Sequence, residues 1–212
     1  MMTESDKLTE EKIFEAAKAV FAERGMDGAR MQEIADRAGI NKSLLHYYFR
    51  TKEKLFSAVF DDLAQMIFMK FAQIFATDMP LEDKISYFFS EHIEFLKANP
   101  GLPLFILSEI NRNPDRMRNL IEKISYEGLW DKVFHDITAK NHDPGVTMHI
   151  DVRDIPQLVT TAISITVFPF AAKNLLAPVL EREGYTFEAY MEERKEFAAR
   201  LTTGFLKTKK PE

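Results

Sequence analysis

The sequence has no cysteine at all and is poor in glycine and proline, with 8 and 9 of them in 212 residues. A chain without cysteine forms no disulfide, carries no thiolate nucleophile and offers no cysteine ligand to zinc. The scarcity of glycine and proline, beside 46% hydrophobic and 29% charged residues, is typical of a folded, helix-rich protein rather than a disordered one. We therefore expect an all-α protein suited to a reducing compartment.

Long apolar runs and catalytic signatures are missing too. No run of about 18 uncharged apolar residues occurs, and the N-terminus, MMTESDKLTEEKIF, lacks a basic stretch followed by an apolar one. The sequence contains no glycine-rich phosphate loop, Gly-x-Ser-x-Gly turn or His-Glu-x-x-His pair. These absences predict a cytoplasmic protein with no membrane partner, no enzyme activity, no cofactor and no metal.

Positive charge is present, but it is concentrated in one short stretch. The net charge of the chain is -5, yet residues 30–54 hold six lysines and arginines against three acidic residues. Residues 1–55 as a whole are balanced, with ten residues of each sign, so the acidic excess lies C-terminal to them. A polyanion such as DNA would therefore meet the stretch 30–54 first.

The spacing of apolar residues predicts helices along most of the chain. In the first helix, apolar residues recur at helical intervals from Ile13 to Phe21, with Thr9 as the N-cap and Gly25 as the residue that ends it. Asn41 and Thr51 are the expected N-caps of the third and fourth helices. The predicted ranges are 9–25, 30–38, 42–48, 51–77, 81–98, 103–112, 115–140, 154–180 and 187–208.

The fourth predicted helix connects two expected domains. At about 1.5 Å per residue it would extend about 40 Å, which is long enough to join two folded units. No internal repeat or flexible linker is visible elsewhere. We therefore place an N-terminal three-helix domain at residues 1–52 and a helical C-terminal domain at residues 53–212.

The stretch EIADRAGINKSLLHYYF has the spacing of a helix-turn-helix. Two short helices that cross closely need a small residue, a turn residue that tolerates positive φ, and apolar residues after the turn. Those requirements are met, at offsets of 0, 4, 5 and 10, by Ala35, Gly39, Ile40 and Leu45. In such a unit the second helix lies in the major groove of DNA and the first crosses the backbone. An ordinary helical hairpin with a solvated charged face is the alternative interpretation.

Candidate DNA contacts lie on the outer faces of the second helix of this unit. Lys42 suits a phosphate or a guanine edge, and Ser43 suits either. Leu44 suits a thymine methyl group, and His46 an acceptor on a base or phosphate. Two further residues, Tyr47 and Lys52, are expected to reach phosphate, the latter with help from the start of the fourth helix.

The segment IFEAAKAVFAERGMDGARMQEIADRAGINKSLLHYYFRTKEKLFSAVF resembles the DNA-binding domain of the TetR/AcrR-type bacterial transcriptional regulators. The family pattern ends its first helix with Phe-x-x-x-Gly, continues through an Ile-Ala-x-x-Ala-Gly turn, and begins its fourth helix with Lys-Glu-x-Leu. Over about residues 9–60 the matching positions are Phe21, Gly25, Ile34, Ala35, Ala38, Gly39, Phe49, Lys52, Glu53 and Leu55. The resemblance implies a DNA-binding regulator, most often a repressor, and favours this interpretation over the plain hairpin.

Two positions depart from the family pattern. The family often has threonine or serine at the start of the second helix, whereas this chain has Ala29 and Arg30, so we expect Arg30 to replace the phosphate contact. His46 stands where the family often has tyrosine. The base preference of a relative is therefore not carried over.

The resemblance also implies a helical C-terminal domain that dimerises and often encloses a small effector. Apolar stripes make the helices near 154–180 and 187–208 the expected homodimer contact, with intramolecular core packing as the alternative. Pro169 should kink the first of these helices. Two recognition helices would then meet successive major grooves of a palindromic double-stranded DNA operator, about 34–36 Å apart.

A small apolar or amphipathic effector, which would release the repressor, is expected to bind among aromatic and methionine side chains with few polar anchors. Each of these side chains is also a candidate for plain core packing. The candidate effector residues are Met66, Met69, Phe88, His92, Phe105, Glu109, Tyr126, Trp130 and Phe168.

Two weaker patterns suggest other chemistry. The pair Asp61 and Asp62 lacks the second acidic cluster that a Mg²⁺-dependent helical enzyme needs. One loop holds four residues of metal-ligand type, which we interpret as surface residues: His142, Asp143, His149 and Asp151. Two rival functions stay open, namely a helix-turn-helix regulator without a small-molecule effector, controlled by a protein partner, and a helical enzyme or adaptor that does not bind DNA.

Overall fold

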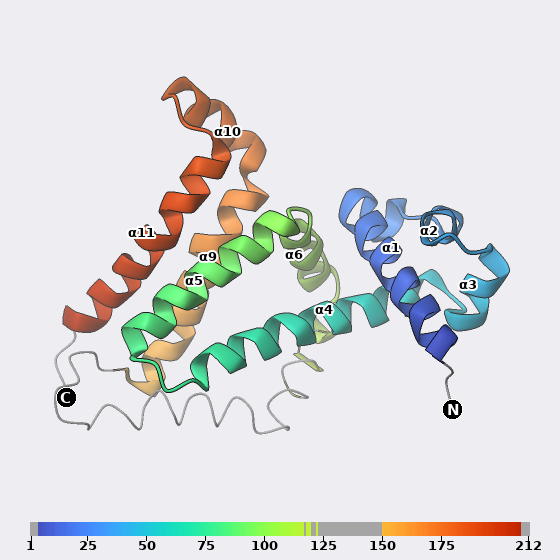
Figure 1. The fold of residues 1–212 in the computed structure, drawn as a ribbon, viewed down its shortest axis with the longest axis horizontal. Coiled ribbons are helices and arrows are strands. Elements are labelled where there is room, and N and C mark those ends of the chain that lie inside the picture. The colour runs from blue at the N-terminus through green and yellow to red at the C-terminus, as the bar shows by residue number, and fades with distance from the viewer. Residues whose placement is uncertain (1–3, 117, 120–121, 123–149, 209–212) are drawn as a thin grey trace. The chain divides into compact units, whose positions relative to one another are not determined.

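The computed structural model describes residues 4–116, 118–119, 122 and 150–208, and every regular element in these ranges is helical (Figure 1). The all-α prediction is confirmed. The elements are α1 (Glu4–Gly28), α2 (Met31–Ala38), α3 (Lys42–Tyr48), α4 (Lys52–Phe75), α5 (Leu81–Ala98), α6 (Leu102–Arg112), the 3-10 turn η2 (Val152–Asp154), α9 (Ile155–Ala171), α10 (Lys173–Arg182) and α11 (Phe187–Thr208). Most of the predicted helix 115–140 lies outside the described residues.

Helix starts and stops mostly follow the sequence signals. Asn41 accepts a hydrogen bond from the Leu44 amide at 2.7 Å, and Thr51 accepts one from the Lys54 amide at 3.2 Å, so both are N-caps. Gly25 has a φ of 66° and interrupts the helical path of α1. The prediction that Thr9 caps α1 is wrong, because the preceding residues contain no helix breaker and α1 already begins at Glu4.

The predicted helix 154–180 is two helices, α9 and α10, which meet at a bend of 77°. The break falls at Ala172 and not at Pro169, which stays inside α9. Proline has no amide to donate to the carbonyl oxygen of Ile165, and Arg194 of α11 donates to that oxygen instead, at 2.7 Å. The carbonyl oxygen that the proline leaves without an amide donor is therefore satisfied by α11. No single helix among the described residues meets the length and hydropathy required of a membrane span, although α9 and α10 taken together do.

Contacts divide the chain into two compact units. The N-terminal unit comprises the residues up to Phe68 together with Leu104–Asn113, and the C-terminal unit comprises Met69–Pro103 together with the residues from Pro114 onward. The predicted boundary at residues 52 and 53 lies inside the N-terminal unit, at the start of α4. Both α4 and α6 belong partly to each unit.

The N-terminal unit has an aromatic core to which α6 contributes. The ring of Phe105, on α6, lies 5.0 Å from that of Phe56 and 6.1 Å from that of Phe60. Phe21 of α1 lies 5.0 Å from Phe56 in an edge-to-face arrangement. Burial of each such ring contributes about 1.5–3 kcal/mol, so residues 104–113 are an integral part of the unit that holds the helix-turn-helix.

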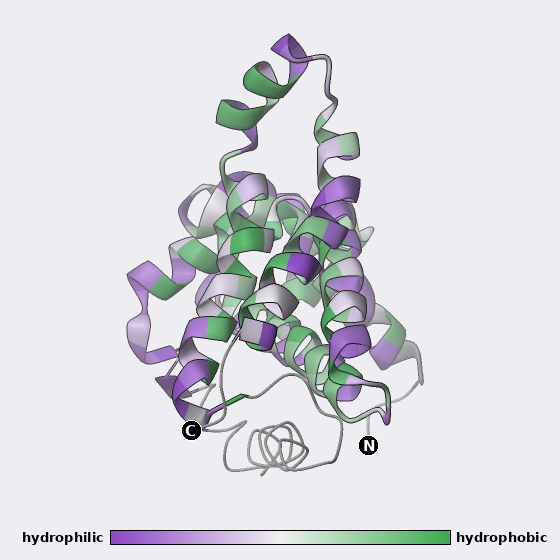
Figure 2. Cartoon of the chain, turned by 90° about the vertical axis from the view of Figure 1, so that its left-hand side faces the viewer, coloured by the Kyte–Doolittle hydropathy of each residue, from purple (hydrophilic) through white to green (hydrophobic). Residues whose placement is uncertain are grey.

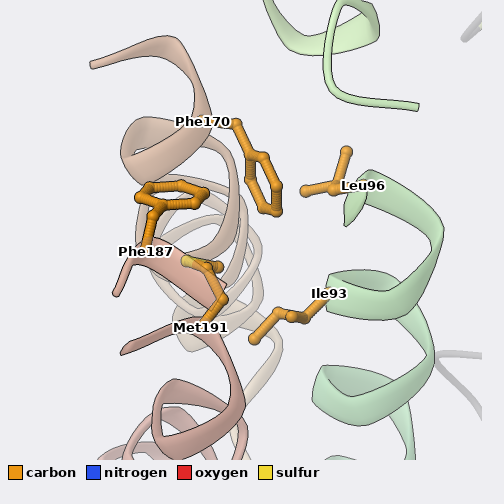
Figure 3. Packing of buried hydrophobic residues seen from close by; sticks show 5 residues of the cluster. All are labelled: Ile93, Leu96, Phe170, Phe187 and Met191. Atoms are coloured by element: carbon orange, nitrogen blue, oxygen red, sulfur yellow. The ribbon is translucent and has the colours of Figure 1, made fainter. Parts of the chain in front are cut away.

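The C-terminal unit is held by a core between α5, α9 and α11 (Figure 3). Ile93 and Leu96 of α5 face Phe170 of α9, and Phe187 and Met191 of α11 close the cluster. The Phe170 and Phe187 rings meet edge to face at 5.6 Å. By contrast, α10 buries no residue, although its middle part, residues 175–180, is largely hydrophobic (Figure 2).

Candidate nucleic-acid interface

The turn between α2 and α3 is closed by backbone hydrogen bonds that depend on Gly39. This residue has φ 69° and ψ 29°, the left-handed conformation that glycine adopts without strain. Its amide donates to the carbonyl oxygen of Asp36 at 3.2 Å, and the amide of Ile40 donates to that of Ala35 at 3.0 Å. This pair of bonds satisfies the end of α2 and fixes the angle at which the chain enters α3.

α3 is fixed on one side and exposed on the other. Leu45 is fully buried, and the ring of Phe49, directly after α3, meets Phe14 of α1 edge to face at 5.7 Å. The side chains predicted to contact DNA lie on the opposite side. Lys42, Ser43, His46 and Tyr47 are exposed, Tyr47 to 80%, whereas Leu44 is half-buried.

His46 has a hydrogen-bond geometry that limits what it can read. Its Nδ1 lies 3.3 Å from the carbonyl oxygen of Arg50. Because a carbonyl oxygen only accepts, this bond requires the proton on Nδ1, and Nε2 of a neutral ring is then an acceptor. In a neutral ring, Nε2 would accept a hydrogen bond from an amino group of a base. The sequence predicted that His46 contacts an acceptor on a base or phosphate, and with Nδ1 bonded to Arg50 this requires a proton on Nε2 as well.

Lys52 is engaged within the protein. Its ammonium donates to the carbonyl oxygens of Asp27 at 3.2 Å and Ala29 at 3.1 Å, across the connection between α1 and α2. An ammonium group has three donors, so one remains for the phosphate contact predicted from the sequence.

Two arginines of the basic stretch differ in their environment. Arg30 is the N-cap residue of α2 but makes no side-chain capping bond, so this helix start lacks the cap that a hydroxyl would give. Arg37 forms a two-pronged ion pair with Glu23, at 2.7 and 2.9 Å, and this hydrogen bonding lowers the pKa of the Glu23 carboxyl. Arg37 therefore adds little positive charge at the surface.

The candidate effector residues are scattered. Met66 and Met69 are 41% and 40% exposed, and Phe168 is 57% exposed. Phe105 and Glu109 are buried in the N-terminal unit. Tyr126 and Trp130 lie outside the described residues.

Only Phe88 and His92 of the candidate set come together in the described part of the C-terminal unit. Their rings are 5.3 Å apart, and Phe71 meets Phe88 edge to face at 5.2 Å. Burial, and then the charge of Lys70, lowers the pKa of His92 to about 4, so the ring is neutral at pH 7. Its Nε2 is buried without a hydrogen-bond partner.

The recess that the described residues form between α5 and α11 is a different place. Its volume is about 240 Å³, and it contains none of the candidate effector residues. Its lining is mostly polar and charged: Glu82, Ser86, Lys195, Glu196, Ala199, Arg200 and Thr203. Within the described ranges, no three histidine or acidic residues are close enough to hold a metal ion. His142, Asp143 and His149 are outside those ranges.

Two polar contacts were not visible in the sequence. Arg112, at the end of α6, donates to both carboxylate oxygens of Asp27 at 3.0 and 2.6 Å. Tyr48, at the end of α3, donates to a carboxylate oxygen of Asp6 at 2.9 Å. Both pairs join residues far apart in the chain, so no local pattern indicates them.

Comparisons with known proteins agree with this geometry. The family described as bacterial regulatory proteins, tetR family, matches residues 13–59. The HTH-type transcriptional repressor KstR2 of Mycolicibacterium smegmatis is 26% identical over 105 residues, 50% of this chain and 51% of that protein, so the match spans about half of the relative. The fatty acid metabolism regulator protein of Bacillus subtilis is 22% identical over 158 residues, covering 74% of this chain and 80% of that one.

A solved structure shows the same fold. The transcriptional regulator FadR of Bacillus subtilis, in complex with stearoyl-CoA, superposes with a TM-score of 0.60 at 18% identity, covering 89% of this chain and 97% of that chain. The two short helices and their glycine turn form a helix-turn-helix, and the other regular elements of the described residues are helices too. The match of residues 13–59 to the tetR family and the similarity to curated repressors support a TetR-family transcriptional regulator. Its relatives are regulators, which confirms the prediction that it is not an enzyme.

Proposed function

We propose that this chain represses transcription as a homodimer on a palindromic operator and leaves the DNA when a small effector binds. The observation that carries the proposal is the state of α3. Its start is capped by Asn41, its inner face is anchored by Leu45, and Lys42, His46 and Tyr47 are exposed. A short helix held this firmly, with cationic and hydrogen-bonding side chains outward, is suited to the major groove.

Exposed apolar side chains on α11 support dimerisation. Phe197, Leu201 and Phe205 recur at intervals of four residues and are 58%, 50% and 52% exposed. Gly204, between two of them, has open space where a side chain would be, which allows a second helix to approach closely. Contiguous apolar surface of this kind marks an interaction site, and a twofold axis would cover it with the same surface of a second copy. Phe168 of α9 is exposed as well and fits this contact better than a pocket.

The effector that we propose is amphipathic. Phe71 and Phe88 supply apolar surface, and the buried Nε2 of His92 lacks the partner that buried polar atoms normally have. A ligand with an apolar chain and one polar group would satisfy both. Because FadR of Bacillus subtilis was solved with stearoyl-CoA, long-chain acyl-CoA is the first class to test.

Selection of bound sequences from random double-stranded DNA, followed by affinity measurements at several salt concentrations, tests DNA binding. We expect a palindromic site and a linear fall of log K with log salt concentration. The proposed function fails if no sequence is enriched and no salt-dependent binding is found.

Release by the effector needs a separate test. Stearoyl-CoA at concentrations well above its Kd should raise the melting temperature and dissociate the protein from the selected operator. Replacing His92 by Phe should weaken both effects while operator binding without ligand is kept. If no acyl-CoA or metabolite changes either property, the regulator controlled by a protein partner is favoured.

A further inference from the structure

The first turns of α1 are attached to the end of the recognition helix α3. The hydroxyl of Tyr48 donates to Asp6 at 2.9 Å in a partly buried hydrogen bond. One residue after α3, the ring of Phe49 meets Phe14 edge to face at 5.7 Å. The C-terminal end of α3 is thus joined to α1 by both polar and aromatic contacts.

Tyr48 also contacts the exposed face of α3. Its ring lies edge to face with that of Tyr47 at 5.6 Å and an interplanar angle of 88°. Tyr47 is itself 80% exposed and belongs to the proposed DNA contacts. A shift of Tyr48 would therefore change the position of a side chain that faces DNA.

We propose that Asp6 is a positioning residue for operator recognition, which holds Tyr48 and thereby sets the orientation of the C-terminal half of α3. This inference rests on the DNA binding proposed above. Asp6 touches no base or phosphate in this role, because it acts only through the tyrosine. The N-terminal turns of α1 then belong to the recognition apparatus, although the sequence pattern of the family begins after them.

The charge of Asp6 allows an experiment to distinguish a carboxylate that positions Tyr48 from a bystander, that is, a carboxylate with no part in positioning α3. A carboxylate beside a helix that approaches phosphates opposes DNA binding by its charge alone. Removing a bystander carboxylate would therefore tighten binding. Removing a positioning carboxylate would weaken binding, since the orientation of α3 is lost. The two roles predict changes of opposite sign.

The protonation state of the tyrosine supports the arrangement. Burial, and then the hydrogen bond to Asp6, raises the pKa of Tyr48, so its hydroxyl stays protonated and remains a donor at neutral pH.

The test compares operator affinity for the full-length wild type, Tyr48→Phe, Asp6→Ala, Asp6→Asn and the double variant Asp6→Ala/Tyr48→Phe. Loss of one hydrogen bond should weaken binding about three- to tenfold in either single variant. The double variant should be no weaker than Tyr48→Phe alone, because that variant has already lost the contact that Asp6→Ala removes. Asp6→Asn keeps an acceptor oxygen and loses the opposing charge, so it should bind at least as well as the wild type.

Two further readouts separate positioning from general destabilisation. The slope of log K against log salt concentration should stay unchanged in Tyr48→Phe, since no phosphate contact is lost. Selection from random DNA should show relaxed preference at the base pairs that face the end of α3. Glu11→Ala removes an exposed bystander carboxylate of α1 and should bind as tightly as the wild type or slightly more tightly, and Tyr185→Phe, at an exposed tyrosine of the C-terminal unit, should bind as the wild type does.

The inference is overturned if Asp6→Ala binds DNA more tightly, if Tyr48→Phe is unchanged, or if the two losses simply add. It is also overturned if base preference is unaltered in variants whose melting temperature falls. A wild type that binds no DNA would remove the proposed function as well, whereas a binding wild type with unaffected variants would remove this inference alone.

Discussion

The two compact units differ in how their polar and apolar surface groups are satisfied. In the N-terminal unit, several charged and polar groups at helix ends find partners within the unit: Asn41 and Thr51 cap helices, and Arg112 pairs with Asp27. In the described part of the C-terminal unit, large apolar side chains of α9, α10 and α11 are exposed, and Nε2 of His92 has no partner. This difference fits the proposed function, in which a second copy and a ligand would cover the exposed and unpaired groups of the C-terminal unit.

The largest effect is expected from the exposed stripe of α11. Changing Phe197 and Phe205 together to glutamate places like charges in the proposed contact, so the dimer should dissociate in sedimentation experiments. Each monomer would then hold only one half-site, and operator affinity should fall about a hundredfold or more. Tyr87→Glu, a 47% exposed aromatic residue of α5, is the control and should remain dimeric. A double variant that stays dimeric would remove α11 from the interface.

The next effect compares two lysines of the N-terminal unit. Lys42 is exposed without a structural bond, whereas Lys52 also holds two carbonyl oxygens. Lys42→Ala should lower the salt slope by about one with an unchanged melting temperature. Lys52→Ala should lower the slope similarly and also destabilise the fold by about 1–3 kcal/mol. Equal melting temperatures for the two variants would show that the carbonyl contacts of Lys52 are not stabilising.

The same contrast explains what the sequence could predict. Periodicity and capping residues located α2, α3 and their turn because those signals are local: Gly39 and Asn41 act within one turn of their own positions. The ring contact of Phe105 with Phe56 joins residues that are distant in the chain. The same holds for the bond from Arg194 to the carbonyl oxygen that Pro169 leaves without a donor. A proposed effector site has no local sequence signal, because aromatic stripes occur in cores and in pockets alike. The predicted effector residues are therefore scattered in the structure.

A smaller effect is expected at the start of the recognition helix. Asn41→Ala removes the acceptor for the Leu44 amide and should destabilise the protein by about 1 kcal/mol. Asn41→Asp keeps the acceptor and should retain the stability of the wild type. Urea unfolding monitored by circular dichroism measures both. The same loss in both variants would contradict a capping role.

The smallest effect belongs to the surface of the C-terminal unit, where Glu94 and Glu192 alternate with Lys97 and Lys195 between α5 and α11. Hydrogen bonds from Lys195, and then from Lys97, lower the pKa of Glu94 to about 2 from a usual value of 4.5. A carboxylate with a lowered pKa contributes its full stabilisation above pH 4.5 and loses it as the pH falls toward 2. Because the group is exposed, solvent screening keeps the contribution below about 1 kcal/mol.

Glu94→Gln should therefore be slightly less stable than the wild type in urea at pH 7, and the difference should shrink as the pH is lowered below 4.5. Added salt at pH 7 should shrink it as well, since exposed ion pairs are screened. Glu193→Gln, a carboxylate next to the network on α11, should leave the free energy of unfolding unchanged. If the difference in free energy of unfolding grew on acidification, the charge of Glu94 would be unfavourable in the folded state. The four-charge network would then not stabilise the C-terminal unit, and its apolar core alone would hold it.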